Sequence, residues 1–192
     1  MSTTDVPIDG FRKTAVTIDF PLRHSRLTTF FRWILVIPLL IFGYVYEIVA
    51  FLATIVAWFS LVITARYPAG IYRFVAGYAR FYTRFAAYLL LAVDTYPPFG
   101  GGEFPEYPVH VTIPERKQKY SRLKAFFRMI YIIPAYVVVV VLGIVLELLV
   151  ILAWFIIVIS GRLPKFIENY MRFAFGWVLK FLALYLLLIE NY

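Results

Sequence analysis

The chain has 192 residues, of which 62% are apolar, 20% are aromatic and only 16% are charged. A soluble domain is close to half apolar and a quarter charged, so this composition and the mean hydropathy of +0.81 predict an integral membrane protein. The chain contains no cysteine, which excludes a disulfide scaffold, thiolate catalysis and iron–sulfur clusters. The net charge of +8 favours anionic partners such as lipid headgroups.

The N-terminal segment, residues 1–24, is polar and contains an alternating stretch at 15–18 that predicts a short β-strand. A similar β-branched stretch at 109–113 lies in the linker, residues 97–120, and is able to pair with the first. Because no apolar run begins near residue 1, we expect no cleaved signal peptide.

Two apolar runs, residues 33–64 and 129–159, dominate the sequence, and each contains a single charge. Each would be roughly 46 Å long as a helix, compared with a hydrocarbon thickness of about 30 Å. An amphipathic segment follows each run, at 71–93 and at 166–189. The sequence therefore predicts an all-α membrane protein in which long transmembrane helices alternate with amphipathic second helices.

The chain is an internal repeat. Displacing the sequence by 96 positions superposes residues 25–96 on residues 121–192 without gaps. We call these segments unit 1 and unit 2. The matched pairs include Arg32 and Arg128, Pro38 and Pro134, Trp58 and Trp154, Arg84 and Lys180, and Asp94 and Glu190.

Three short motifs resemble a bacterial membrane-protein family that is known only as a domain of unknown function. They are Ala-Trp-Phe at 153–155, Gly-Arg-Leu-Pro at 161–164 and Asp-Thr-Tyr-Pro-Pro-Phe at 94–99. The resemblance covers both units and departs at the C-terminus, where the chain ends before a second Pro-Pro-Phe. It supports the tandem architecture and implies no activity.

Two topologies are compatible with this pattern. In the first, each unit spans the membrane twice, and the excess of Lys and Arg before each long run puts both termini in the cytoplasm of a bacterial inner membrane. In the second, each long run is a re-entrant hairpin and each amphipathic helix lies on the cytoplasmic surface. We favour four spans, because a hairpin tip would leave unsatisfied backbone groups in lipid.

Intramembrane carboxylates indicate function unless a partner explains them. Depth along the helices predicts that Glu47 pairs with Arg84, and that Glu147 pairs with Lys180, as ion pairs joining the two helices of each unit. The functional alternative is a proton or cation relay. The two histidines lie outside the apolar runs, so a bis-histidine haem within the bilayer is excluded, and the pattern predicts no metal site and no cofactor.

Basic and aromatic residues complete the set of candidate sites. Basic side chains beside the long runs predict contacts with anionic headgroups: Arg26, Arg32, Lys117, Lys119, Arg122, Lys124 and Arg128. The aromatic face of the first amphipathic helix predicts packing against lipid or a neighbour: Tyr78, Phe81, Tyr82 and Phe85. Trp58 and Trp154, near the ends of their runs, are typical of an interfacial belt.

Since no nucleophile–base pair or phosphate-binding motif is present, we expect no enzyme and no nucleic-acid partner. The preferred interpretation is an accessory or scaffold subunit that stabilises a larger membrane complex. One alternative is a homo-oligomeric transporter or channel that uses Glu47 and Glu147. The other is a membrane-organising protein that binds anionic lipids.

Overall fold

The structure is a computed structural model that describes residues 14–190. It is mostly helical, as the sequence predicts, and has one short strand before each unit. The elements in chain order are β1 (Ala15–Ile18), α1 (Arg26–Phe30), α2 (Arg32–Leu35), α3 (Ile37–Thr64), α4 (Ala69–Leu89), β2 (Val109–Thr112), α5 (Arg122–Phe126), α6 (Arg128–Ser160) and α7 (Lys165–Tyr185).

The two apolar runs form the long helices α3 and α6, which have 28 and 33 residues. Both are long and apolar enough to cross a membrane. Neither folds back on itself, so the hairpin topology is wrong. Each long helix contains a proline near its start. Pro38 lies in the first turn of α3, where a backbone N–H would have no intrahelical partner, so the helix tolerates it. Pro134 lies inside α6, which continues through it.

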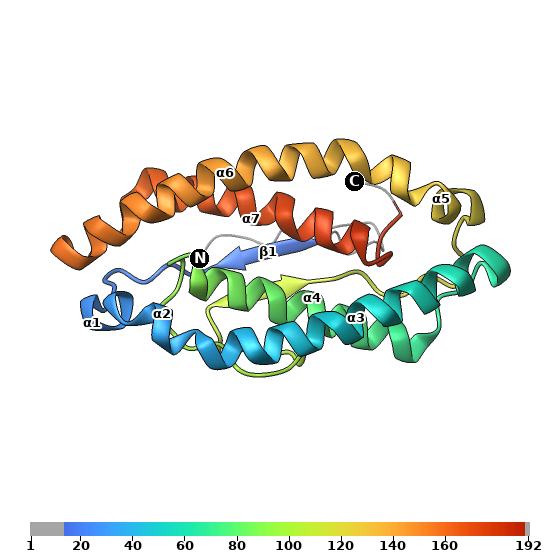
Figure 1. Cartoon of the computed structure of the whole chain (residues 1–192), viewed down its shortest axis with the longest axis horizontal. Helices are drawn as coiled ribbons and strands as arrows, with labels where there is room; N and C mark the ends of the chain where they lie inside the picture. Colours follow the sequence, from blue (N-terminus) through green and yellow to red (C-terminus); the bar gives the residue numbers. More distant parts are fainter. Residues whose placement is uncertain (1–13, 191–192) are drawn as a thin grey trace, which may run out of the picture.

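The predicted pairing of the two strands is confirmed. β1 and β2 form an antiparallel ribbon in which Val16 lies opposite Val111. The ribbon runs through the middle of the molecule, with α7 beside β1 and α4 beside β2 (Figure 1). Each amphipathic helix is therefore flanked by the ribbon and by the long helix of its own unit.

The two units are related by an approximate two-fold axis, and the long helices consequently run antiparallel (Figure 1). The molecule is elongated, with α1 at one end and α5 at the other. Within each unit the amphipathic helix packs against the long helix, and the outermost positions are occupied by α3 and α6. The start of each unit thus meets the turn that joins the long helix to the amphipathic helix of the other unit. We call these turns the Ala65 corner and the Gly161 corner.

Backbone hydrogen bonds fix this contact at both ends. The N–H of His24 donates to the carbonyl of Gly161 at 2.9 Å, and the N–H of Tyr120 donates to the carbonyl of Ala65 at 2.9 Å. Ala65 and Gly161 end the long helices in left-handed conformations, with φ of 56° and 70°. Because helix C-terminal carbonyls lack intrahelical donors, the residue immediately before each unit supplies a donor to the end of the other unit's long helix.

The two tryptophans strengthen the same contacts. The indole N–H of Trp58 donates to the carbonyl of Ala125 at 2.9 Å, and that of Trp154 donates to the carbonyl of Thr29 at 3.3 Å. The pairs are equivalent under the repeat. Both indoles thus connect one unit to the other rather than serving only as an interfacial belt.

The linker follows the length of the molecule from the end of α4 to α5 and touches α4 through glycines. A Cβ built on Gly101 would lie 2.3 Å from the Cα of Gly77, so the two backbones are in direct contact. Only glycine at these two positions permits this approach. The Gly100–Gly102 run, predicted to be linker, is thus also the surface on which α4 packs.

Replacing Gly101 with alanine is expected to destabilise the fold by about 2 kcal/mol, because the new methyl group would overlap backbone atoms of Gly77. Thermal unfolding in detergent, followed by circular dichroism, measures the change. Gly70→Ala is the matched control, since a Cβ at Gly70 meets nothing within 4 Å. Equal unfolding midpoints for the two variants would contradict the close contact.

Candidate functional site

Near the C-terminal end of each unit, a carboxylate forms hydrogen bonds with residues at the start of the same unit. Asp94 accepts a hydrogen bond from the N–H of Ser25 at 2.7 Å and one from the guanidinium of Arg32 at 2.6 Å. The Nδ1 atom of His24 lies 3.1 Å from the same carboxylate. The guanidinium of Arg32 also donates to the carbonyls of Tyr88 and Val93. These contacts hold the start of unit 1 against the end of α4.

Unit 2 repeats the arrangement. Glu190 accepts from the N–H of Ser121 at 2.6 Å and from the ammonium of Lys117 at 2.7 Å. The guanidinium of Arg128 donates to the carbonyl of Ile189 at 2.7 Å. Both carboxylates therefore serve the fold and leave little surface for a ligand.

Arg32 and Arg128, predicted to contact headgroups, are buried instead, with exposed fractions of 3% and 5%. Their guanidinium groups donate to backbone carbonyls inside the protein and are too deeply buried to contact lipid headgroups. Lys117 is half-buried beside Glu190. The other predicted lipid-contact residues are exposed: Arg26, Lys119, Arg122 and Lys124.

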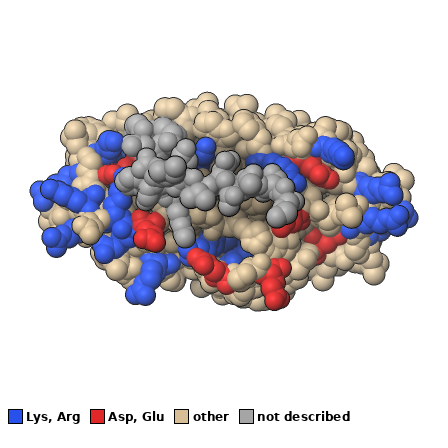
Figure 2. Space-filling view, turned by 180° about the vertical axis from the view of Figure 1, so that it is seen from behind, with Lys and Arg blue, Asp and Glu red and all other residues tan. Residues whose placement is uncertain are grey.

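The exposed basic residues lie at the two ends of the molecule. Arg26 lies beside the Gly161 corner, where Arg162 and Lys165 are also exposed. At the other end, Lys119 and Arg122 flank the Tyr120 contact with the Ala65 corner. Lys and Arg gather at these ends, and Asp and Glu lie between them across the face shown in Figure 2.

The predicted ion pairs between α3 and α4, and between α6 and α7, are not formed. Arg84 instead donates to the carbonyls of Gly100 and Gly102 at 2.8 Å each, and its guanidinium lies 4.7 Å from the ring centre of Phe104. The ammonium of Lys180 lies 5.7 Å from the ring centre of Trp177. Within residues 14–190, neither Glu47 nor Glu147 has an ion-pair or hydrogen-bond partner.

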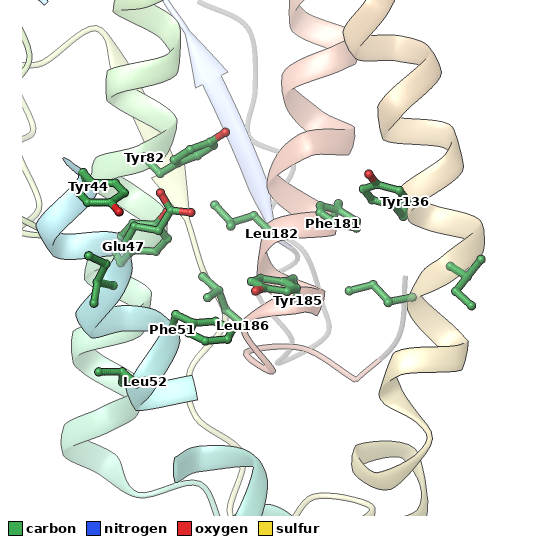
Figure 3. Close-up of a pocket in the computed structure, with 14 residues that line it drawn as sticks. Tyr44, Glu47, Phe51, Leu52, Tyr82, Tyr136, Phe181, Leu182, Tyr185 and Leu186 are labelled. Carbon is green, nitrogen blue, oxygen red and sulfur yellow. The ribbon is translucent and has the colours of Figure 1, made fainter. Parts of the chain in front are cut away.

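Glu47 lies in a groove of about 690 Å³ between the two units. We call it the Glu47 groove. Its walls come from all four of the main helices, α3, α4, α6 and α7, and Glu47 is its only charged lining residue among those described. Figure 3 shows the carboxylate pointing into the groove below the ring of Tyr82, with Tyr185 on the α7 side. The tyrosines of the lining are Tyr44, Tyr78, Tyr82, Tyr136 and Tyr185.

Glu147 lies in a second groove, of about 560 Å³, which only partly overlaps the position equivalent to the first, since Glu147, Leu89 and Leu90 correspond to Phe51, Tyr185 and Leu186. We call it the Glu147 groove. Its aromatic side chains are Trp33, Trp154 and Phe155, and no tyrosine is among the described residues of its lining. Arg32 also lines the Glu147 groove, whereas no arginine is among the described residues that line the Glu47 groove. The two carboxylates thus have different surroundings.

The aromatic face of α4 packs inside the protein. Phe81 and Tyr78 are buried, and the ring of Tyr46 on α3 lies 5.4 Å from that of Tyr78 and 5.8 Å from that of Phe81. Phe85 stacks on Phe81, with ring centres 6.2 Å apart. The rings of Tyr78 and Phe81 therefore pack against α3 of the same chain. Tyr78 and the half-buried Tyr82 also line the Glu47 groove.

Sequence reasoning did not find Tyr136 and Tyr185 as groove residues, because they come from unit 2 whereas Glu47 belongs to unit 1. The part of the chain that the structure describes contains no group of three side chains able to hold a metal ion. His24 contacts Asp94, and His110 lies 3.6 Å from Asp19 on the ribbon. Both histidines therefore have carboxylate partners outside the grooves.

A family model described as a domain of unknown function (DUF4389) matches residues 26–100 and again residues 122–192. The chain belongs to this family, and it carries the domain twice, as the sequence motifs predict. Comparison with curated proteins and with solved structures found no match.

The Asp94 cluster makes stability depend on pH. Burial alone would raise the pKa of Asp94, but the hydrogen bonds from His24 and Ser25, with the charges of His24 and Arg32, lower the pKa overall. A lowered folded-state pKa contributes stability above the unfolded value of 3.8, and this stability is lost as the pH falls through the folded value. We expect the thermal midpoint to fall below about pH 4.

Asp94→Asn should flatten this dependence and cost about 2 kcal/mol at neutral pH, because Arg32 loses a charged acceptor. Glu103→Gln is the control, since its ion pair with Arg80 is solvent-exposed on the Glu103 side and such pairs contribute little. An Asp94→Asn profile that parallels the wild-type profile would contradict this assignment.

Proposed function

We propose that the protein is a non-catalytic membrane protein that lies in the plane of an anionic bilayer, with α3 and α6 embedded along their length. The observation that carries the proposal is the antiparallel arrangement of the two units, which brings each Arg-containing corner beside the basic start of the other unit. The apolar sides of α3 and α6 would contact lipid. Their exposed large side chains run the full length of both helices.

A four-span topology conflicts with this arrangement. It requires α3 and α6 to cross the bilayer in the same direction, with both corners opposite the two starts. The hydrogen bonds from His24 to Gly161 and from Tyr120 to Ala65 join the corners to the starts instead. If the long axis of the molecule crossed the membrane, the linker and its Glu103 would also pass through the hydrocarbon region, where charged groups are costly.

An in-plane orientation fits the lengths and charges of the helices. At 28 and 33 residues, α3 and α6 are roughly 42 and 50 Å long, which exceeds the hydrocarbon thickness of about 30 Å. Lying flat, they keep their basic ends at headgroup level. The face with the linker and ribbon would meet water. Because Lys and Arg favour the cytoplasmic leaflet, we place this face and both termini in the cytoplasm of an inner membrane.

An accessory or scaffold role in a larger membrane complex is a second candidate. It is supported by the apolar surface of α6, where Val137, Val141 and Leu148 are more than half exposed. Such a surface accommodates a partner helix as well as lipid tails. Purification in mild detergent followed by mass spectrometry of the intact assembly distinguishes the two roles: a stoichiometric partner supports scaffolding, and a monomer with lipid supports the first proposal.

Site-directed labelling tests the orientation directly, because the native chain has no cysteine. Single cysteines at Arg26, Arg66, Arg122 and Arg162 should all react with a membrane-impermeant maleimide from the same side of sealed vesicles. These residues lie at the two ends of the molecule, and all four are exposed. Reaction of Arg66→Cys and Arg162→Cys from the opposite side would restore the four-span topology.

The lipid preference is a separate prediction. Replacing Arg26, Lys119 and Arg122 with alanine should lower the preference for phosphatidylglycerol over phosphatidylcholine several-fold, since exposed basic residues near the membrane surface attract anionic headgroups. Electron paramagnetic resonance with spin-labelled lipids measures the preference. The wild type in high salt is the control, because salt weakens contacts between exposed charges. An unchanged preference in the variant would exclude these side chains as headgroup ligands.

A further inference from the structure

We propose that the Glu47 groove binds a single-chain amphiphile that carries one ammonium group and no phosphate. The inference deepens the proposed function and rests on the proposed membrane location, because the exposed Glu47 is removed from water only where lipid fills the groove. It rests on the free carboxylate, the tyrosines around it, the lack of a lining cation among the described residues, and the different chemistry of the Glu147 groove.

The carboxylate of Glu47 needs a cationic partner. Its neighbours are apolar and aromatic, with Ile48, Phe51 and Leu52 on the same helix and Ile132 on the facing one, and Glu47 itself is exposed. Where lipid rather than water fills the groove, an ionised carboxylate is costly unless a positive charge or hydrogen-bond donor approaches it. No described residue supplies either. A ligand ammonium group would supply both the charge and, where it carries protons, the donors.

The tyrosines add a second reason to expect an ammonium group. Aromatic faces attract cations that lose their water, and quaternary ammonium groups are typically bound among several such rings. In Figure 3, Tyr44 and Tyr82 lie on the same side of the groove as Glu47, and Tyr136 and Tyr185 lie on the side of unit 2. The rings thus come from both units, with Tyr82 nearest the carboxylate and Tyr136 beyond Phe181 on the far side of the groove (Figure 3).

The other lining residues of the Glu47 groove indicate that the ligand carries an alkyl chain and no phosphate group. Among the described residues that line the groove there is no Lys, Arg or His, so a phosphate group would have no counter-charge. This argues against a phospholipid headgroup. Apolar side chains such as Ile133, Phe181 and Leu186 fit an alkyl chain. The volume of about 690 Å³ lies in the usual range for small-molecule sites.

Comparison of equivalent positions in the two units distinguishes residues that the fold requires from residues that occur only in the Glu47 groove. Residues that stabilise the fold match across the repeat: Arg32 matches Arg128 within the units, and Trp58 matches Trp154 between them. The polar groove residues do not match. Glu47, Tyr44, Tyr78, Tyr82, Tyr136 and Tyr185 correspond to Gly143, Val140, Ala174, Val178, Leu40 and Leu89. Since the same fold forms with small or aliphatic residues there, the carboxylate and tyrosines are not required for packing.

The test is photolabelling of the full chain in phosphatidylcholine nanodiscs with a dodecyltrimethylammonium probe that carries a diazirine on its chain. Mass spectrometry of peptides locates the label. We expect labelling of the segments around Tyr136 and Phe181, and an about tenfold loss of labelling in Glu47→Gln, in line with the strength of desolvated cation–carboxylate and cation–π contacts. Excess dodecylamine should compete, and dodecanol should not.

Glu147→Gln is the matched control, since it removes the equivalent kind of charge from the groove that lacks tyrosines; its labelling should equal that of the wild type. The thermal midpoint of each variant shows that folding is retained. Equal labelling of Glu47→Gln and the wild type would overturn the proposal. So would equal competition by dodecanol, which would indicate an apolar groove only, or effective competition by phosphatidylethanolamine, which would indicate a phospholipid site.

Discussion

The structure depends on the way each long helix ends. A helix that is apolar along its length still finishes with carbonyl groups that need donors, and these donors are expensive to provide in lipid. Here they come from the other unit, because the N–H groups of Tyr120 and His24 bond to the carbonyls of Ala65 and Gly161. The two helix ends are therefore satisfied only when the units pack head to tail. The antiparallel arrangement, the basic residues at both ends and the full-length path of the linker all follow from this exchange.

Much of the architecture is predictable from the sequence, because it is local or periodic. The long apolar runs, the amphipathic segments after Pro68 and Pro164, the two strands and the repeat itself all correspond to elements of the structure. The relation between the units is not predictable in this way. A duplicated sequence is compatible both with parallel units and with units related by a two-fold axis, and hydropathy is identical in the two cases. Only the long-range hydrogen bonds decide, and no local pattern encodes them.

The candidate site shows the same limit at the level of single residues. Matching Glu47 with Arg84 by depth assumed that the basic face of α4 turns towards α3. It turns towards the linker, because the contact between Gly77 and Gly101 brings backbone carbonyls within reach of the guanidinium. A guanidinium satisfied by carbonyls no longer needs a carboxylate. Arg32 was misassigned to headgroups for a similar reason, since its partners lie more than fifty residues away along the chain.

The approximate two-fold symmetry applies to the contacts that stabilise the fold but not to the residues that line the two grooves. The contacts between units occur in equivalent pairs, so a change in one member is felt by the packing of both helices and is resisted by the fold. The lining of the Glu47 groove takes part in none of these paired hydrogen bonds, whereas Trp154 in the lining of the Glu147 groove donates one of them. The two linings differ: one combines Glu47 with tyrosines, and the other combines Glu147 with tryptophans and Arg32. The polar residues of the Glu47 groove therefore lie at positions that the paired contacts leave unconstrained.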